Sequence, residues 1–187
     1  EFLSLLSPRT RLIILNSPQN PTGGVLDPED LAVIAREAAA RDIMVLSDEI
    51  YSHILYDKKF KSIIDEPGMS ERTVILDGFS KTYSMTGWRL GYGVWPSAIV
   101  DQAERLQINS TSCANAVTQV AAIEALRGPQ DAVDAMCAAF DERRLIIHEE
   151  LNAIPGFSCV MPKGAFYAFP NTSGTGIASR ELEERFL

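Results

Sequence analysis

The sequence has few cysteines and histidines and no long apolar run. Cys113, Cys137 and Cys159 are odd in number, widely spaced and without a metal-ligand pattern, which is typical of free thiols in a reducing compartment. His53 and His148 lie far apart in the chain, so no metal site is expected. No apolar stretch approaches the roughly 20 residues of a membrane span, and no signal peptide pattern opens the chain. These absences predict a cytoplasmic protein with no membrane partner.

Basic residues are sparse relative to acidic ones. The chain has 17 Lys and Arg residues against 25 Asp and Glu residues, a formal net charge of −8. Its densest basic clusters are short: 58–61 is expected to be a solvated loop, and Arg143-Arg144 a helix surface facing water. Nucleic acid is therefore not an expected partner, and small metabolites remain the open class of ligand.

The first half of the chain alternates apolar runs with a helical pattern. Strands are predicted at 11–15, 43–47, 73–77 and 90–94, and a helix at 27–41 that begins with Asp27-Pro28-Glu29-Asp30. A polar loop rich in Pro, Gly and Asn follows the first strand. This order predicts an α/β fold with a mostly parallel sheet.

The second half changes character. Helices are predicted at 96–108, 116–127, 131–154 and 180–187, and a β-hairpin at 157–161 and 165–169. A small polar stretch, 109–115, separates the two halves. The sequence therefore predicts two domains: 1–110, the α/β part, and 111–187, the start of a smaller α+β part.

One lysine has neighbours that suggest chemistry. Lys81 follows Ser80 directly after a predicted strand, and Arg89 lies eight positions on, between Gly87 and Gly91. A lysine amine can bond covalently to pyridoxal phosphate, whereas a planar guanidinium holds phosphate with two hydrogen bonds. Lysines in general lie at solvated surfaces, but this context favours a cofactor site.

Two further motifs follow the ends of the first two strands. The first is Asn16-Ser17-Pro18-Gln19-Asn20-Pro21-Thr22-Gly23, which could also be a turn built for backbone reasons alone. The second is Ser47-Asp48-Glu49-Ile50-Tyr51. Open α/β sheets bind ligands at the carboxyl ends of their strands, which favours a functional interpretation of both. A carboxylate at such a strand end needs a cationic partner, which we expect for Asp48. Glu49 is expected to be an exposed acid.

In this order the three motifs resemble those of class I/II aminotransferases of pyridoxal-phosphate fold type I, which are similar to aspartate aminotransferase. The resemblance covers nearly the whole chain. It implies the second half of the family's cofactor-binding large domain followed by the start of its small domain, to which Pro-x-Gly-Ala-Phe-Tyr at 162–167 belongs. It also implies pyridoxal 5′-phosphate as cofactor.

The resemblance assigns a role to each matching residue. Asn20 and Tyr51 would bind the 3′ oxygen of the cofactor, and Asp48 would pair with its protonated pyridine nitrogen. Ile50 would pack on one ring face, and Ser80 and Arg89 would bind the phosphate. Lys81 would carry the covalent bond to the cofactor and move the substrate proton. The catalytic residues implied are Lys81, Asp48 and Tyr51.

The implied activity is transfer of an amino group between an α-amino acid and a 2-oxo acid, by a homodimer. A carbon–sulfur β-lyase of the same fold would use the same residues, and a cofactor-sensing regulator attached to a DNA-binding module is a different class of protein that shares the fold. Both alternatives stay open.

Both ends of the chain look like cuts. The chain opens with Glu1, and an amphipathic helix ends it without a stop signal, while family members have about twice this length. We expect an internal fragment that lacks the family's glycine-rich phosphate loop, ring-stacking aromatic and substrate-carboxylate arginine. Such a piece would not transaminate alone.

Overall fold

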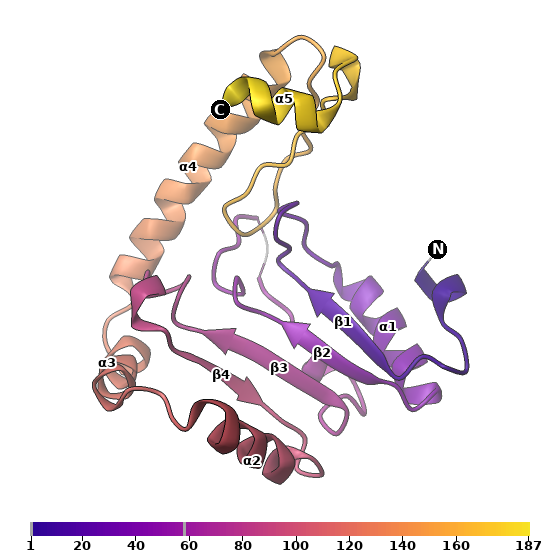
Figure 1. Cartoon of the computed structure of the whole chain (residues 1–187), viewed down its shortest axis with the longest axis vertical. Helices are drawn as coiled ribbons and strands as arrows, with labels where there is room; N and C mark the ends of the chain where they lie inside the picture. Colours follow the sequence, from indigo (N-terminus) through magenta and orange to yellow (C-terminus); the bar gives the residue numbers. More distant parts are fainter. Residues whose placement is uncertain (1, 58) are drawn as a thin grey trace.

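The fold is built on a four-stranded sheet in the order β1-β2-β3-β4 (Figure 1). The computed structural model describes residues 2–57 and 59–187. The strands are β1 (Leu12–Asn16), β2 (Met44–Asp48), β3 (Thr73–Gly78) and β4 (Gly91–Val94). The first three run parallel, and β4 runs antiparallel to β3. This confirms the predicted mostly parallel α/β sheet.

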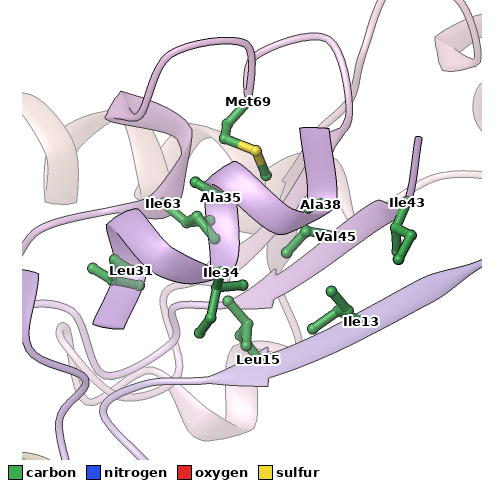
Figure 2. Close-up of a cluster of buried hydrophobic side chains, with 10 residues drawn as sticks. All are labelled: Ile13, Leu15, Leu31, Ile34, Ala35, Ala38, Ile43, Val45, Ile63 and Met69. Atoms are coloured by element: carbon green, nitrogen blue, oxygen red, sulfur yellow. The ribbon is translucent and has the colours of Figure 1, made fainter. Parts of the chain in front are cut away.

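Helix α1 (Pro28–Ala40) covers one face of this sheet. Its apolar side chains recur with helical spacing and pack on alternate residues of β1 and β2, because successive strand side chains point to opposite faces. Figure 2 shows the resulting core: Ile13, Leu15, Leu31, Ile34, Ala35, Ala38, Ile43, Val45, Ile63 and Met69. Burial of each large aliphatic side chain contributes about 1.5–3 kcal/mol, so this cluster is a main source of stability.

The opposite face of the sheet is more open. Leu12 and Ile14 alternate with the core residues of β1 and are 48% and 69% exposed. By strand register, Leu12, Ile14 and Asn16 lie beside Met44, Leu46 and Asp48. Asp48 therefore lies on the face opposite α1.

The remaining elements are helical. They are α2 (Val100–Thr111), α3 (Ala116–Arg127), α4 (Asp131–Ala153) and α5 (Ser179–Phe186), with short 3-10 turns at Phe2–Leu5, Ile63–Asp65, Thr86–Trp88 and Ser173–Thr175. In Figure 1, α4 runs from beside α3 and the sheet toward α5 and the C-terminus. The predicted helices at 116–127 and 131–154 are confirmed within one residue.

Helix α2 begins and ends later than predicted. The carbonyl of Pro96 accepts hydrogen bonds from Ile99 and Val100, so a separate turn precedes the helix. At the other end, the Asn109 side chain donates to the Arg105 carbonyl at 2.7 Å, and the Ser110 hydroxyl to the Gln107 carbonyl at 3.3 Å. These polar side chains satisfy helix carbonyls, which lets the helix continue to Thr111 through part of the predicted 109–115 linker.

The predicted hairpin at 157–161 and 165–169 is wrong. The structure has only an isolated bridge there, in which the backbones of Ser158 and Asn171 exchange hydrogen bonds of 2.9 and 2.7 Å. The intervening segment bonds instead to the first half of the chain: Gly164 N donates to Gly23 O, and Ala165 N donates to Ile54 O. We call residues 162–167 the docking segment.

Candidate active site

The strand register brings the three sequence motifs to one edge of the sheet. Asp48, the last residue of β2, pairs with Asn16 on β1 and with Leu76 on β3. Asn16 leads into the loop that contains Asn20, and β3 ends at Gly78, just before Lys81. The carboxyl ends of parallel strands meet at the same edge, which is where open α/β sheets bind ligands.

The loop after β1 is folded by its own hydrogen bonds. Gln19 N donates to Gly24 O at 2.8 Å, and Gly23 N donates to Gln19 O at 2.9 Å. Asn20 N donates to the Asn16 side chain at 2.8 Å. The Ser17-Pro18 and Asn20-Pro21 peptide bonds are both cis. Asn20 is exposed in this loop, and its side chain reaches the Tyr51 hydroxyl.

Tyr51 is the centre of the site. It is 2% exposed, and its hydroxyl lies 2.5 Å from the Tyr167 hydroxyl of the docking segment. Burial raises the pKa of Tyr51 far above its ordinary value; the Tyr167 hydroxyl and the Asp48 carboxylate raise it further, while the Asn20 side chain opposes them. The phenol therefore stays protonated at neutral pH and is a hydrogen-bond donor.

Lys81 lies beside Tyr51. Its Nζ is 5.9 Å from the ring centroid of Tyr51 and 5.6 Å from that of Phe166, so the amine faces two aromatic rings. Within residues 2–57 and 59–187, no carboxylate forms an ion pair with Lys81. Its turn is anchored by buried Phe79 and Met85, with Met85 N donating to Phe79 O at 3.2 Å.

Asp48 and Ile50 lie between the other motifs. Asp48 Oδ1 accepts a hydrogen bond from Ile50 N at 3.3 Å, and the carboxylate is half-buried. In the described part of the chain, Asp48 has no ion pair. Ile50 Cδ1 would lie 3.4 Å from a Cβ at Gly78, so Ile50 packs against the end of β3. A partly desolvated carboxylate without a cation is ready to accept one.

Ser80 and Arg89 are placed less completely. Arg89 is exposed, has a left-handed backbone with φ 52°, and donates from Nη1 to the Thr86 carbonyl at 2.9 Å. It borders a hollow of about 510 Å³ with Trp88 and Asn115. No hydrogen bond between described residues joins Ser80 or Arg89 to Tyr51. The structure thus brings Asn20, Asp48, Tyr51 and Lys81 together and leaves Ser80 and Arg89 at the margin.

Glu49 is not the exposed acid that we expected. It is 5% exposed, and its Oε1 accepts hydrogen bonds from the hydroxyls of Ser47 at 2.9 Å and Ser62 at 2.6 Å. Burial raises the pKa of Glu49, the two serines oppose the shift, and the Asp77 and Asp65 carboxylates add to it. Its backbone N donates to Leu76 O at 2.8 Å. Glu49 therefore fixes the turn that joins Asp48 to Tyr51.

Arg144 also differs from its prediction. It is 8% exposed instead of facing water, because it donates to Asp57 and Asp141 at 2.8 Å each and to the Pro162 carbonyl at 2.9 Å. Its partners come from the loop after Tyr51 and from the docking segment. Arg144 thus ties α4 to the region of the site.

Two aromatic residues at the site were not predicted. Phe166 and Tyr167 lie edge-on to Tyr51, with ring centroids 5.3 and 5.7 Å from it. The sequence offered one signal, the Pro-x-Gly-Ala-Phe-Tyr motif, but nothing in it tells which side chain reaches Tyr51. His53 is exposed, and the described residues contain no group of three or more possible metal ligands. A search of the described residues finds no helix long and apolar enough to span a membrane.

Comparison with known proteins identifies the family. A family model described as aminotransferase class I and II matches residues 1–185. The chain is 43% identical over 190 residues to an aspartate aminotransferase of Pyrococcus abyssi, and equally to aromatic-amino-acid aminotransferase 2 of Thermococcus litoralis; each match covers 100% of this chain and 49% of the relative. The solved structure of an aromatic aminotransferase from Pyrococcus horikoshii OT3 has a TM-score of 0.94 at 41% identity, covering 98% of this chain and 50% of that one.

The chain therefore spans about half the length of the curated relatives that it matches. The match nevertheless extends from the first motif through the docking segment to the last helix. The fold, the order of the motifs and the family model agree, and we conclude that this chain belongs to the class I and II aminotransferases.

Proposed function

We propose that this chain provides the cofactor-binding part of a pyridoxal-phosphate-dependent aminotransferase, which moves an amino group between an α-amino acid and a 2-oxo acid. The observation that carries the proposal is the grouping around Tyr51. A neutral phenol, an amide, a carboxylate and an amine from three separate segments converge at the carboxyl edge of one sheet. The relatives are named as aminotransferases, which supports the same activity.

The residues present fit this cofactor, because their charges are not already used. Asp48 is half-buried without an ion pair, and Lys81 has no carboxylate partner, within the described residues. The Arg89 guanidinium forms no ion pair with a described residue, and it donates a hydrogen bond to a carbonyl of its own turn. The protonated ring nitrogen of the cofactor would pair with Asp48, its aldehyde would bond to Lys81, and its phosphate would pair with Arg89.

Pyridoxal phosphate, when bound, supplies an aldehyde carbon for amine attachment and an electron-withdrawing ring that stabilises negative charge on the attached carbon. Lys81 would hold it covalently through Nζ and, once released, would take the α proton of the substrate as a base. The rings of Tyr51 and Phe166 lie on two sides of that amine and orient it toward the carboxyl edge of the sheet.

The other residues would hold and orient. Asp48 would keep the ring nitrogen protonated, since a carboxylate beside a cation favours the charged form of both. Tyr51 and Asn20 would donate hydrogen bonds to the ring oxygen, and Ile50 would pack on the ring. Ser80 and Arg89 would bind the phosphate, for which Arg89 presents an exposed guanidinium.

The assembly and compartment stay predictions. We propose a homodimer in the cytoplasm, from the family resemblance and the free thiols at Cys113, Cys137 and Cys159. Sedimentation of the full-length protein tests the dimer.

The activity can be tested on the full-length protein that contains this chain. Pyridoxal phosphate is added, excess is removed, and the absorbance of the bound cofactor is followed while L-aspartate or L-tyrosine and then 2-oxoglutarate are supplied. Conversion to the amine form by the amino acid and back by the oxo acid is expected. Release of pyruvate from L-cystathionine without that cycle would instead favour the β-lyase, and failure to bind cofactor would contradict the proposal.

A further inference from the structure

The hydroxyl oxygens of Tyr167 and Tyr51 lie 2.5 Å apart. Tyr167 comes from the docking segment, 116 residues away in sequence. Its ring packs edge-on to Tyr51, with an interplanar angle of 83°. The contact therefore joins the C-terminal half of the chain directly to the residue at the centre of the proposed cofactor site.

The hydrogen-bonding capacity of the two hydroxyls limits how Tyr51 can act at the site. A tyrosine hydroxyl donates one hydrogen bond and accepts up to two. The Asn20 side chain lowers the pKa of Tyr51, as a donor to its oxygen does. If Tyr167 also donates to that oxygen, the proton of Tyr51 stays available for a third group. If Tyr51 donates to Tyr167 instead, that proton is used.

We propose that Tyr167 is a positioning residue for the cofactor site: its hydroxyl donates to Tyr51, leaving the Tyr51 proton to be donated to the cofactor's ring oxygen. This inference rests on the proposed function. Hydrogen bonds in a chain polarise one another, so a donor behind Tyr51 makes Tyr51 a better donor. Tyr167 itself need not touch the cofactor.

The docking segment is held rigidly enough to place this hydroxyl. Gly23 O accepts from Lys163 N at 2.8 Å and from Gly164 N at 3.1 Å, which fixes the segment to the loop that carries Asn20. Ala165 N donates to Ile54 O at 2.9 Å, and the Tyr56 hydroxyl donates to Ala165 O, which fix it to the turn after Tyr51. The loop that carries Asn20 and the turn that follows Tyr51 are thus both hydrogen-bonded to the docking segment, which carries Tyr167.

Among the described residues, four polar or charged groups interact with Tyr51. They are the hydroxyl of Tyr167, the side chain of Asn20, the carboxylate of Asp48 and the amine of Lys81. Asp48 and Lys81 are unchanged by removal of one hydroxyl at Tyr167. A change in the site's titration after Tyr167→Phe can therefore be traced through Tyr51.

The test uses the full-length protein loaded with pyridoxal phosphate and titrated by absorbance. A hydrogen bond donated by Tyr51 favours the cofactor form that has a negatively charged ring oxygen. Weakening this hydrogen bond should therefore raise the midpoint pH of the absorbance titration. Tyr167→Phe should raise it by roughly 0.3 to 0.7 pH units, about a two- to five-fold change in the dissociation constant. In a Tyr51→Phe background the same change should do nothing. Tyr56→Phe, which removes one of several hydrogen bonds that hold the docking segment, should shift the midpoint less than Tyr167→Phe does.

An unchanged or lowered midpoint in Tyr167→Phe overturns the proposal, as does an equal shift in the Tyr51→Phe background or in Tyr56→Phe. Thermal unfolding of the unloaded protein separates this failure from failure of the proposed function. If the two hydroxyls are hydrogen-bonded, the melting temperatures of Tyr51→Phe, Tyr167→Phe and the double variant are non-additive. If the melting temperatures are non-additive but the protein binds no cofactor, the Tyr51–Tyr167 contact is retained and its role at the cofactor is rejected. If the melting temperatures are additive, the contact itself is rejected.

Discussion

Arg144 on α4 binds the carboxylate of Asp57 with both ends of its guanidinium, Nη1 at 2.8 Å and Nη2 at 3.3 Å. The guanidinium also lies 4.5 Å from the ring centroid of Tyr56. Asp57 lies in the loop that follows the turn carrying Tyr51, so this contact connects the long helix to the proposed site. The Arg144 hydrogen bonds lower the pKa of Asp57.

We expect Arg144→Met to lower the free energy of unfolding by about 1–3 kcal/mol, because it removes several charge-assisted bonds and leaves the Pro162 carbonyl without its donor. Asp57 is largely exposed, so water solvates it and limits the loss. Arg143→Met is the control, since Arg143 is exposed and its guanidinium lies over the ring of Phe140. Urea unfolding measures both. Equal losses in the two variants would contradict a special role for Arg144.

Gly23→Ala should loosen the docking segment. Gly23 has φ +68°, and a Cβ there would lie 2.6 Å from Pro162 Cβ and 3.0 Å from Tyr167 O. Gly68 is a matched control, because it has φ +74° but open space around a Cβ. Gly68→Ala should cost about 1–2 kcal/mol from backbone strain, and Gly23→Ala clearly more. Hydrogen exchange at Ala165 N should rise only in Gly23→Ala.

Glu49→Gln should change how stability depends on pH. The folded carboxyl has a raised pKa, so it binds its proton more tightly than the unfolded one does. The free energy of unfolding therefore falls as pH rises from the ordinary value of 4.5 through the raised value. Glu49→Gln has no carboxyl group to titrate at this position, so its free energy of unfolding should change less with pH over that range. Unfolding at several pH values measures it, and exposed Glu71→Gln should retain the original slope.

Asp48→Ala should retain covalent cofactor binding but lose most turnover, because the charge on the ring nitrogen matters for the carbanion and not for attachment of an amine. Asp48→Glu, which keeps a carboxylate, should be milder. Absorbance measures binding, and single-turnover kinetics with an amino acid measure the reaction. Unchanged turnover in the alanine variant would mean that another group holds the ring nitrogen.

Reduction of the loaded protein with borohydride should fix the cofactor to Lys81. Peptide mapping identifies the labelled lysine, and Lys81→Arg should abolish the label. Lys163 lies in the docking segment and is the matched control, so Lys163→Arg should label normally. Label on Lys163 with Lys81 unmodified would reject the assignment.

Local chemistry made the elements of the first half predictable. Pro28 and the acids after it, with apolar residues at helical spacing, specify α1 within the chain segment itself, and the structure places α1 at Pro28–Ala40. Continuous apolar runs specify the strands in the same way. The motifs that follow those strands could then be assigned to one edge of the sheet.

The failures at Glu49, at Arg144 and at the hairpin depend on partners distant in sequence. Glu49 is buried because Ser62 lies beside it, and Arg144 because Asp57 and Pro162 do. The hairpin at 157–169 is absent because the backbone of the docking segment bonds to Gly23 and Ile54. Strand propensity and periodicity do not report contacts of this range, so a sequence read segment by segment could not have identified Tyr167.

The antiparallel pairing of β4 with β3 constrains how this protein can change length. Gly78 pairs with Gly91, and a Cβ at Gly78 would lie 2.9 Å from Gly91 Cα, so both ends of the 79–90 connection are clamped in register. A one-residue insertion there could not be absorbed by slippage, since the strand that slips would turn its side chains, Asp77 on β3 or Tyr92 on β4, to the opposite face. The spacing between Lys81 and Arg89 should therefore tolerate substitution far better than insertion or deletion, and an engineer grafting this connection would have to transplant both strands with it.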